Sequence, residues 1–302
     1  MGPSDNSQEA AMEKLIKTTP AMDMAVAATL LREAKEIMDA LGVVFFLRQG
    51  TCLGAIRDNA FIPWDDDLDI GSIYGMHGLT GESFDKVAAA FRTRGFHVRS
   101  GESGGEAWLG LMKQNMRIDW YCYRVRKEHI AHFPAVRIPV RLFTDLKEIE
   151  FIGERFLVPN PPDEYLQCKY GPNWHTPNRA GYGKDVIDNI PLGPMPGRPA
   201  TWKQRLLSTL FPHRGARLQV LDTTGSPIDH ANVALVGWSQ SWTNRDGYAR
   251  FYLPREDIYA LRVAHGGHEE VLYEEELAPG KTYVYRPDPE TPAGRIFVLD
   301  TE

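Results

Sequence analysis

Four aspartates crowd into five consecutive positions, in the segment DDDLD at residues 65–69. From Asp67 onward they alternate with the apolar Leu68 and Ile70, and this period of two is typical of a β-strand with one polar and one apolar face. On such a strand Asp67 and Asp69 project to the same side, about 6.6 Å apart. Two carboxylates this close repel each other unless a cation lies between them. The segment therefore predicts a partly buried strand that carries a charged site, and it argues against a solvated acidic turn.

The carboxylate oxygens of this segment are hard ligands, which suit Mg²⁺ or Mn²⁺. We expect Asp67 and Asp69 to hold the ion. Asp65 stands at the entrance of the strand, where it is either a third ligand or a residue that orients the others. Asp66 has the opposite parity, so we expect it to lie outside the site.

A neighbouring strand is expected to supply a further carboxylate. Asp119 is the single acid in the run MRIDWYCY at residues 116–123, and burying it without a partner would be costly. We therefore expect Asp119 to join the metal site. A salt bridge from Asp119 to Arg117 or to another strand partner is the alternative.

Gly50 and Thr51 stand at the start of a segment with helical spacing, after an apolar run at residues 43–47. A glycine in the first turn of a helix lets backbone N–H groups approach a phosphate, and the helix dipole adds attraction. The pair alone is weak evidence. Followed by a strand with paired aspartates, it is the pattern of a nucleotidyltransferase site, so we expect Gly50 and Thr51 to contact phosphate.

The first 190 residues predict an α+β domain around a mixed sheet. After an expected tail at residues 1–20, helical spacing covers residues 21–41, 50–57 and 83–94, with Ser83 as a helix cap, and a proline pair opens a short helix over 161–170. Strands are expected at 43–47, 67–70, 96–99, 107–112, 117–123, 136–143 and 148–158. We assign residues 21–190 to the catalytic domain.

The C-terminal part has a different pattern, with short β-type runs at roughly ten-residue spacing. These runs are 216–222, 231–236, 248–253, 258–265, 268–274 and 282–286. They predict a small all-β sandwich over residues 215–302. Residues 191–214 precede it as a proline-rich linker and an amphipathic segment, with the boundary near Arg214.

Composition excludes several classes of protein. Residues 215–302 hold 8 basic and 14 acidic side chains, which leaves 26 of each in residues 1–214, so neither part has the basic excess of a nucleic-acid-binding protein. The sequence has no apolar run of about 18 residues, and residues 1–8 lack the apolar core of a signal peptide. The three widely spaced cysteines argue against disulfides and favour a reducing compartment. We therefore expect a cytoplasmic protein.

The segment GTCLGAIRDNAFIPWDDDLDIG resembles the signature of the LicD family of phosphocholine and alditol-phosphate transferases, which includes the fukutin-related proteins. The family pattern is a Gly-Thr-Leu-Leu-Gly-like run, an arginine, and then Phe-Ile-Pro-Trp-Asp-x-Asp-x-Asp. The matching residues are Gly50, Thr51, Leu53, Gly54, Arg57, Phe61, Ile62, Pro63, Trp64, Asp65, Asp67 and Asp69. Cys52 replaces the usual leucine. Tyr170, Gly171 and Trp174 are similar to the family's Tyr-Gly-x-x-Trp ending, so the resemblance covers roughly residues 25–180.

The resemblance implies a nucleotidyltransferase-like fold. It also implies transfer of a substituted phosphate, such as phosphocholine or an alditol phosphate, from a CDP-activated donor to a sugar hydroxyl with release of CMP. The acceptor would be a glycan or a lipid-linked glycan. Mg²⁺ on the aspartates would bridge the donor diphosphate. Asp119 would bind a second ion or accept the proton of the attacking hydroxyl.

Four further residues are candidates for substrate binding. Arg57 is expected to clamp a phosphate, unless it pairs with Asp58. Lys113 is a weaker phosphate candidate. Trp64 is expected to pack more than to stack on a base, and His175 is expected to line the acceptor side unless it lies on the surface.

The C-terminal runs resemble carboxypeptidase regulatory-like and transthyretin-like sandwiches, in which an Asp-Gly turn such as Asp246-Gly247 joins two strands. Such modules seldom catalyse, so we expect an accessory role. Residues 202–214 mix large apolar with basic residues. They predict either a helix on an anionic membrane, which would place the protein at the inner face of the membrane, or a helix that packs the two domains together.

Two other functions stay open. The same carboxylates would serve a nucleotidyltransferase that transfers NMP and releases pyrophosphate, and a chain with an inactive site would be a glycan-binding protein. The intact set Asp65, Asp67 and Asp69 argues against the second of these. If the aspartates hold a metal, Asp67→Asn or Asp69→Asn should cut turnover by several orders of magnitude with equal or higher thermal stability, because charge repulsion is relieved.

Overall fold

The computed structural model describes residues 5–103, 106–180, 182–188, 190, 215–291 and 293–301. The chain divides into two compact units: unit 1 is Met1–Ala131 with Arg137–His175, and unit 2 is His132–Val136 with Thr176–Glu302. The division follows His175, whereas the sequence predicts a boundary near Arg214. The predicted linker and amphipathic segment at 191–214 lie outside the described residues.

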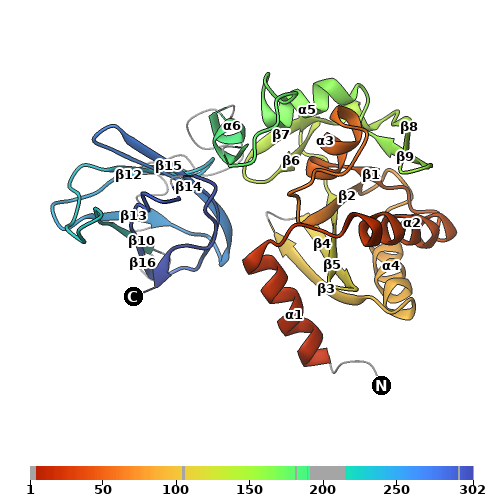
Figure 1. Cartoon of the computed structure of the whole chain (residues 1–302), viewed down its shortest axis with the longest axis horizontal. Coiled ribbons are helices and arrows are strands. Elements are labelled where there is room, and N and C mark those ends of the chain that lie inside the picture. Colours follow the sequence, from red (N-terminus) through yellow and green to blue (C-terminus); the bar gives the residue numbers. More distant parts are fainter. Residues whose placement is uncertain are drawn as a thin grey trace. The chain divides into compact units, whose positions relative to one another are not determined.

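Unit 1 is built on a mixed five-stranded sheet in the order β1-β2-β5-β4-β3 (Figure 1). Its central strands β2 (Asp67–Ile73) and β5 (Met116–Tyr123) are parallel, and the other neighbouring pairs are antiparallel. The remaining strands are β1 (Phe46–Leu47), β3 (His97–Ser103) and β4 (Glu106–Lys113). Helices and a mixed sheet are the architecture that the order of predicted elements indicates.

One face of this sheet is apolar, and the helices α2 (Met24–Ala40) and α4 (Gly81–Thr93) pack against the sheet (Figure 1). Leu68 of β2 and Trp120 of β5 are fully buried on this face. The Trp120 ring stacks on Phe84 of α4 with ring centroids 5.6 Å apart. Because side chains alternate along a strand, the charged residues of β2 and β5 therefore lie on the other face of the sheet.

Residues 1–20, which we expect to be a tail, contain the helix α1 (Asp5–Thr18). This helix lies against β3, where its Glu9 is 2.8 Å from His97. Its Met12 is buried over Gly110 of β4, and an added Cβ on that glycine would lie 2.5 Å from the Met12 Cε. The sequence of this segment lacks the broad apolar stripe of a packed surface helix. Its pattern therefore does not predict α1.

Turns divide two of the predicted strands. The run 148–158 is a hairpin of β8 (Lys147–Phe151) and β9 (Glu154–Val158), because Ile152 and Gly153 between them adopt positive φ. The run 136–143 is β7 (Val136–Pro139) followed by a 3₁₀ turn over Val140–Phe143, and β7 pairs with the unpredicted β6 (His129–His132).

The other helices of unit 1 lie where the sequence predicts them. They are α3 (Gln49–Arg57) and α5 (Pro162–Tyr170). Helix α4 is capped by Thr80, and the predicted cap Ser83 occupies the third helical position, where its hydroxyl accepts the Thr80 N–H in a reciprocal capping box.

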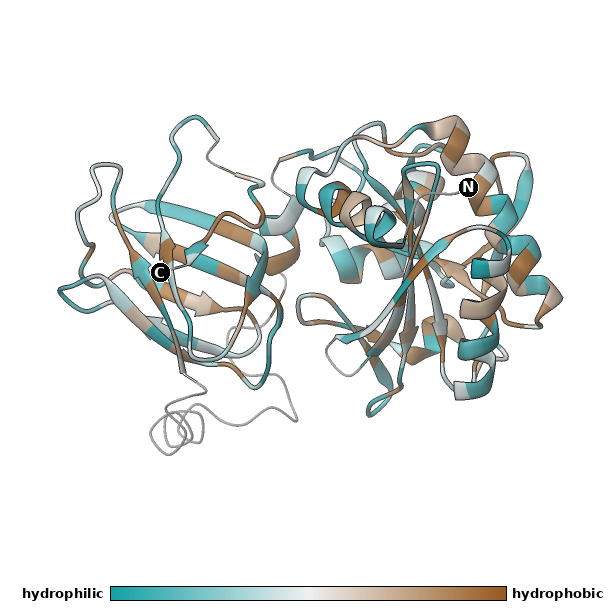
Figure 2. Ribbon diagram, turned by 90° about the horizontal axis from the view of Figure 1, so that it is seen from below, coloured by the Kyte–Doolittle hydropathy of each residue, from teal (hydrophilic) through white to brown (hydrophobic). Residues whose placement is uncertain are grey.

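Unit 2 contains two four-stranded sheets, with the orders β13-β10-β16-β17 and β12-β11-β14-β15, and the short helix α6 (Tyr182–Asp188). The strands are β10 (Gly215–Val220), β11 (Asn232–Leu235), β12 (Ser239–Trp242), β13 (Tyr248–Tyr252), β14 (Asp257–His265), β15 (His268–Leu277), β16 (Thr282–Tyr285) and β17 (Asp300–Thr301). Buried residues of both sheets share one core, and apolar and polar segments alternate along the strands (Figure 2). The sequence did not predict β12, β17 or α6. The resemblance of this unit to carboxypeptidase regulatory-like modules stays a prediction.

The three cysteines are free thiols, of which Cys52 and Cys122 are buried and Cys168 is half-buried. Among the helices of the described ranges, none combines the length and the apolar character needed to cross a membrane.

Candidate active site

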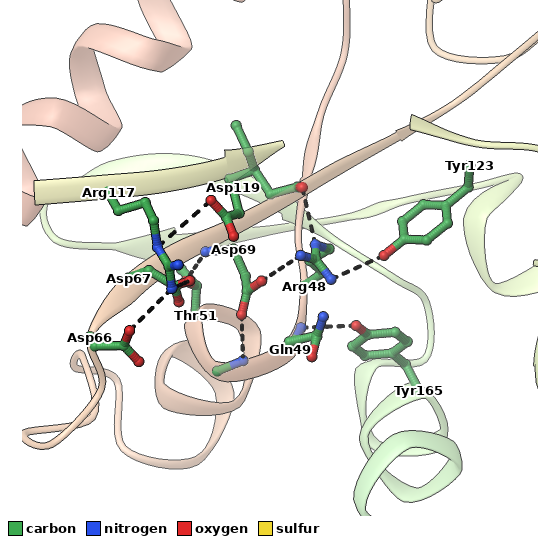
Figure 3. Close-up of polar contacts among 12 residues, drawn as sticks. Arg48, Gln49, Thr51, Asp66, Asp67, Asp69, Arg117, Asp119, Tyr123 and Tyr165 are labelled. Atoms are coloured by element: carbon green, nitrogen blue, oxygen red, sulfur yellow. Dashed lines mark hydrogen bonds and ion pairs between the residues drawn. The ribbon is translucent and has the colours of Figure 1, made fainter. Parts of the chain in front are cut away.

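The second face of the unit 1 sheet carries charged side chains at its centre (Figure 3). Because β2 and β5 are parallel, Asp67 lies opposite Arg117, and Asp69 lies opposite Asp119. Residues two apart on a strand share a face, so the four side chains form a compact square on the face that the apolar residues leave free. The structure thus brings Asp67, Asp69 and Asp119 together, as the alternation predicts.

Asp69 is held by the start of helix α3 and by the residue before it. The Arg48 guanidinium lies 2.6 Å from Oδ1 of Asp69, and the Gly50 N–H donates to Oδ2 at 3.3 Å. The backbone N–H of Asp69 donates to the buried Thr51 hydroxyl at 2.8 Å. Of the two residues that we expect to contact phosphate, Gly50 therefore binds the Asp69 carboxylate and Thr51 binds the Asp69 backbone in this structure.

Arg48 is a buried cation that the sequence analysis missed. Its side chain is 3% exposed. It also donates to the carbonyl oxygen of Ile70 and to the Tyr123 hydroxyl, and it lies over the Tyr121 ring. Burial raises the pKa of Asp69, and the Arg48 guanidinium opposes that rise. A lone arginine before a short helix carries no periodic signal, so only the tertiary structure identifies it.

Helix α5 contributes two further residues to this region. The Tyr165 hydroxyl accepts the N–H of Gln49, the first residue of α3, at 2.9 Å. Lys169 is buried one turn later on the same side of α5, and its charge also lowers the pKa of Asp69. A lysine four residues after a tyrosine on an otherwise apolar helix face is the sequence signal that could have found it.

Where the chain enters β2, the carboxylates of Asp65, Asp66 and Asp67 form a compact group, in which one oxygen of each lies within 4.8 Å of the others. Oδ2 of Asp65 is buried and has no hydrogen-bond partner among the described residues. Burial, together with the charges of Asp67 and Asp69, raises the pKa of Asp65 well above its ordinary value. Asp66, which the alternation predicts to lie outside the site, is thus close to Asp65 and Asp67. Asp65 and Asp66 precede the first residue of the strand, so the alternation of side chains does not apply to them.

Both glycines of the GTCLG run lie where the chain packs closely. A Cβ on Gly50 would lie 2.3 Å from Oδ2 of Asp65, and a Cβ on Gly54 would lie 2.5 Å from the carbonyl oxygen of Ala60. The loop between α3 and β2 therefore folds back onto the helix only because these positions lack side chains. This close approach places the Asp65 carboxylate against the first turn of α3.

Arg117 lies among three of the carboxylates. One of its terminal nitrogens is 2.5 Å from Oδ2 of Asp67 and 3.1 Å from Oδ2 of Asp66, and its Nε is 3.8 Å from Oδ1 of Asp119. Burial raises the pKa of Asp119, and Arg117 opposes the rise. The ion pair between Asp119 and Arg117, which we named as the alternative, is thus present. It is longer than the ion pair between Arg117 and Asp67.

The residues of this cluster fit a divalent cation. A buried carboxylate oxygen without a partner, as on Asp65, is an unsatisfied acceptor that a metal ion would satisfy. The surrounding donors are carboxylate oxygens, which Mg²⁺ and Mn²⁺ prefer. Several like charges brought together from a loop and two strands also need a compensating cation.

The remaining predicted residues lie apart from this cluster. Arg57 pairs with Asp58 through two nitrogens, at 2.7 and 3.0 Å, so the local alternative holds rather than the phosphate clamp. Lys113 contacts both carboxylate oxygens of Glu33 at 2.8 Å and donates to the carbonyl oxygen of Arg94, so the structure places this weaker phosphate candidate away from the cluster. Both side chains find a nearer partner, which the spacing of the motif does not show.

Trp64 and His175, the other two candidates for substrate binding, differ in their exposure. Trp64 is half-buried and directly precedes Asp65. His175 is exposed, and its ring stacks on the buried Trp174 with ring centroids 3.7 Å apart. The surface position that we named as the alternative for His175 is the one observed.

The close approach at Gly50 leads to a test of the cluster. We expect Gly50→Ala to weaken Mn²⁺ binding about tenfold, because the new methyl group must displace the Asp65 carboxylate. Titration calorimetry measures the affinity. Gly81→Ala is the matched control, since a Cβ there has open space. Equal Mn²⁺ affinity in the Gly50 variant and the native chain would contradict the proposed position of the ion.

Comparison with known proteins finds a match for the segment that holds this cluster. Residues 42–161 match the family model "LicD/FKTN/FKRP, nucleotidyltransferase domain". The resemblance to the LicD family that the GTCLG and DDDLD runs predict is therefore confirmed for these residues.

Curated relatives are about one-quarter identical to this chain over the aligned residues. The human protein named "Ribitol-5-phosphate transferase FKTN" is 26% identical over 173 residues, which cover 54% of this chain and 36% of that protein. The human "Ribitol 5-phosphate transferase FKRP" is 26% identical over 45% of this chain and 29% of its own length. An uncharacterized protein of Rickettsia typhi is 23% identical over 48% of this chain and 45% of its own length. The chain thus spans about a third of the length of the two named transferases.

Among solved structures, the crystal structure of ANT(2″)-Ia in complex with adenylyl-2″-tobramycin matches 44% of this chain and 68% of its own. The TM-score is 0.32 and the sequence identity is 15%.

Proposed function

We propose that this chain is a Mg²⁺- or Mn²⁺-dependent transferase that moves a substituted phosphate from a CDP-activated donor to a sugar hydroxyl of a cell-surface glycan and releases CMP. The observation that carries the proposal is the compact group of Asp65, Asp66 and Asp67, with its buried, partnerless Asp65 oxygen. This group lies inside the segment that matches the LicD/FKTN/FKRP domain. The names of the relatives favour ribitol phosphate as the transferred group, with phosphocholine and other alditol phosphates as further candidates.

In this proposal Asp65, Asp67 and Asp69 hold the ion. When bound, the ion neutralises the donor diphosphate and the charge that builds on the departing CMP. Arg48 positions Asp69 by fixing one of its oxygens, and the N–H of Gly50 orients the other. Burial of these carboxylates keeps water away and strengthens their interaction with a cation.

Asp119 is proposed as the residue that accepts the proton of the attacking hydroxyl. Its carboxylate is separate from the Asp65–Asp67 oxygen group and is 24% exposed, so an acceptor can reach it. Burial raises its pKa, which makes it a better proton acceptor than a solvated aspartate. The hydroxyl oxygen then forms a bond to the donor's outer phosphorus, the bond from that phosphorus to the CMP oxygen breaks, and the proton stays on Asp119.

The test is to follow CMP release from CDP-ribitol, CDP-glycerol and CDP-choline by chromatography, in the presence of MgCl₂ and a panel of sugar acceptors. We expect release with at least one donor and none after EDTA is added. Pyrophosphate release from nucleoside triphosphates without CMP release would support the NMP transferase instead. If the folded protein neither releases CMP nor binds CDP in calorimetry, the proposal fails in favour of a non-catalytic glycan-binding protein.

A further inference from the structure

Arg117 occupies the middle of the carboxylate cluster. It lies on β5 directly opposite Asp67, with its guanidinium 2.5 Å from Asp67, 3.1 Å from Asp66 and 3.8 Å from Asp119. These three carboxylates come from the loop before β2, from β2 itself and from β5. The guanidinium therefore balances the charge at the place where the proposed ion would be held.

Arg117 and a bound divalent ion would compete for the same ligand. Asp67 is both the nearest partner of Arg117 and one of the proposed metal ligands. Two cations drawn to one carboxylate repel each other at short range. Binding of the ion therefore favours a position of Arg117 in which another anion replaces Asp67 as its partner.

The two arginines that pair with these aspartates differ in how free they are to change partner. Arg48 is 3% exposed and divides its donors among Asp69, the carbonyl oxygen of Ile70 and the Tyr123 hydroxyl. Arg117 is 13% exposed, and its guanidinium contacts the carboxylates of Asp66, Asp67 and Asp119. A guanidinium presents a planar fork of N–H donors that matches a phosphate as well as it matches a carboxylate.

We infer that Arg117 exchanges partners in the catalytic cycle: it pairs with Asp67 and Asp66 in the metal-free protein, and it binds the diphosphate of the nucleotide donor once the ion has taken Asp67. This inference rests on the proposed function, and it assigns Arg117 as a substrate-binding residue. The exchange also gives a role to the arginine that lies two residues before Asp119, the proposed proton acceptor, on the same face of β5.

The exchange predicts effects of opposite sign on two ligands, which a purely structural role would not produce. In Arg117→Met, we expect Mn²⁺ to bind about fivefold more tightly in the absence of nucleotide, because a competing cation is removed. CDP should bind about 10- to 100-fold more weakly in the presence of Mg²⁺, because a charge-assisted contact is lost. Both affinities are measured by titration calorimetry on the full chain.

Two more variants complete the experiment. Arg117→Lys keeps the charge and loses the fork, so Mn²⁺ affinity should stay near the native value while CDP affinity falls. Arg94→Met is the matched control, because Arg94 also contacts two carboxylates, those of Glu33 and Glu36, outside the cluster. It should leave both affinities unchanged.

The outcomes separate this inference from the proposed function. Native CDP affinity in Arg117→Met would overturn the inference, and so would a parallel loss of Mn²⁺ and CDP binding, since Arg117 would then only support the carboxylates. If the native chain binds no CDP and releases no CMP, the proposed function itself fails. Circular dichroism spectra of the variants, and the Arg117→Lys affinities, show whether a loss comes from misfolding.

Discussion

We expect Asp69→Asn to lower the rate of CMP release by about three orders of magnitude, since several kcal/mol of charge stabilisation depend on the ion that this carboxylate would hold. The same variant should lower the free energy of unfolding of unit 1 by about 3 kcal/mol. The reason is Arg48: its buried guanidinium lies 2.6 Å from Asp69 and would lose its carboxylate. The structure thus leads us to expect lower stability at this position, where the sequence alone predicts equal or higher stability after removal of the charge.

A double-mutant cycle identifies the cause of the destabilisation. If the cost in Asp69→Asn comes from the stranded Arg48 charge, the variant that combines it with Arg48→Met should be more stable than the sum of the two single changes predicts. Chemical unfolding followed by the helical circular dichroism signal suits this measurement, because five of the six described α-helices, α1 to α5, belong to unit 1. Unchanged stability in Asp69→Asn, or a tenth or more of the native turnover, would contradict the role given to Asp69.

The strand that carries the site could be predicted because its pattern is local. Alternation from Asp67 to Ile70 predicts both the strand and the face that its two aspartates share, and β2 shows both. A further acid is expected on a neighbouring strand, for which Asp119 in the run 116–123 is the candidate, and Asp119 lies opposite Asp69 in the parallel register. In each case the period of two decides which side chains reach the same face.

The partners of these aspartates could not be predicted, because they depend on packing between segments far apart in the chain. Arg48 contacts Asp69 only because α3 packs against β2. Arg117 contacts Asp67 most closely because the register of β2 and β5 places these two residues opposite each other. Asp66 joins the cluster because the chain before β2 is a loop, where alternation gives no guidance.

The expected phosphate ligands could not be placed from the sequence either. A motif identifies residue types, but it does not show which neighbour each side chain will contact. Lys113 neutralises Glu33 and Arg57 neutralises Asp58, so both charges are satisfied outside the cluster. Such pairs form wherever a carboxylate lies within reach of a long basic side chain, and their positions are set by the packing of helices and loops.

Asp65→Asn should have the opposite effect on stability from Asp69→Asn. Asp65 has no described counterpart to Arg48: its buried Oδ2 lacks a hydrogen-bond partner in the part of the chain that the structure describes. Burial and the charges of Asp67, Asp69 and Asp66 all raise its pKa. An asparagine of the same shape removes the charge, so we expect the melting temperature in metal-free buffer to rise by about 2–4 °C, which corresponds to about 1 kcal/mol.

The gain in stability should come with a loss of metal binding. An uncharged amide is a weaker ligand, so Mn²⁺ affinity should fall at least about tenfold, and the rise in melting temperature that Mn²⁺ gives the native chain should shrink accordingly. Asp39→Asn serves as the control, because Asp39 is an exposed carboxylate paired with Lys35 outside the cluster, and its loss should change neither quantity appreciably. A fall in the metal-free melting temperature of Asp65→Asn, with Mn²⁺ affinity retained, would mean that Asp65 is a structural residue. The expected changes in stability at Asp65 and Asp69 have opposite signs because the two carboxylates have different neighbours. A buried arginine lies beside Asp69, whereas other carboxylates lie beside Asp65.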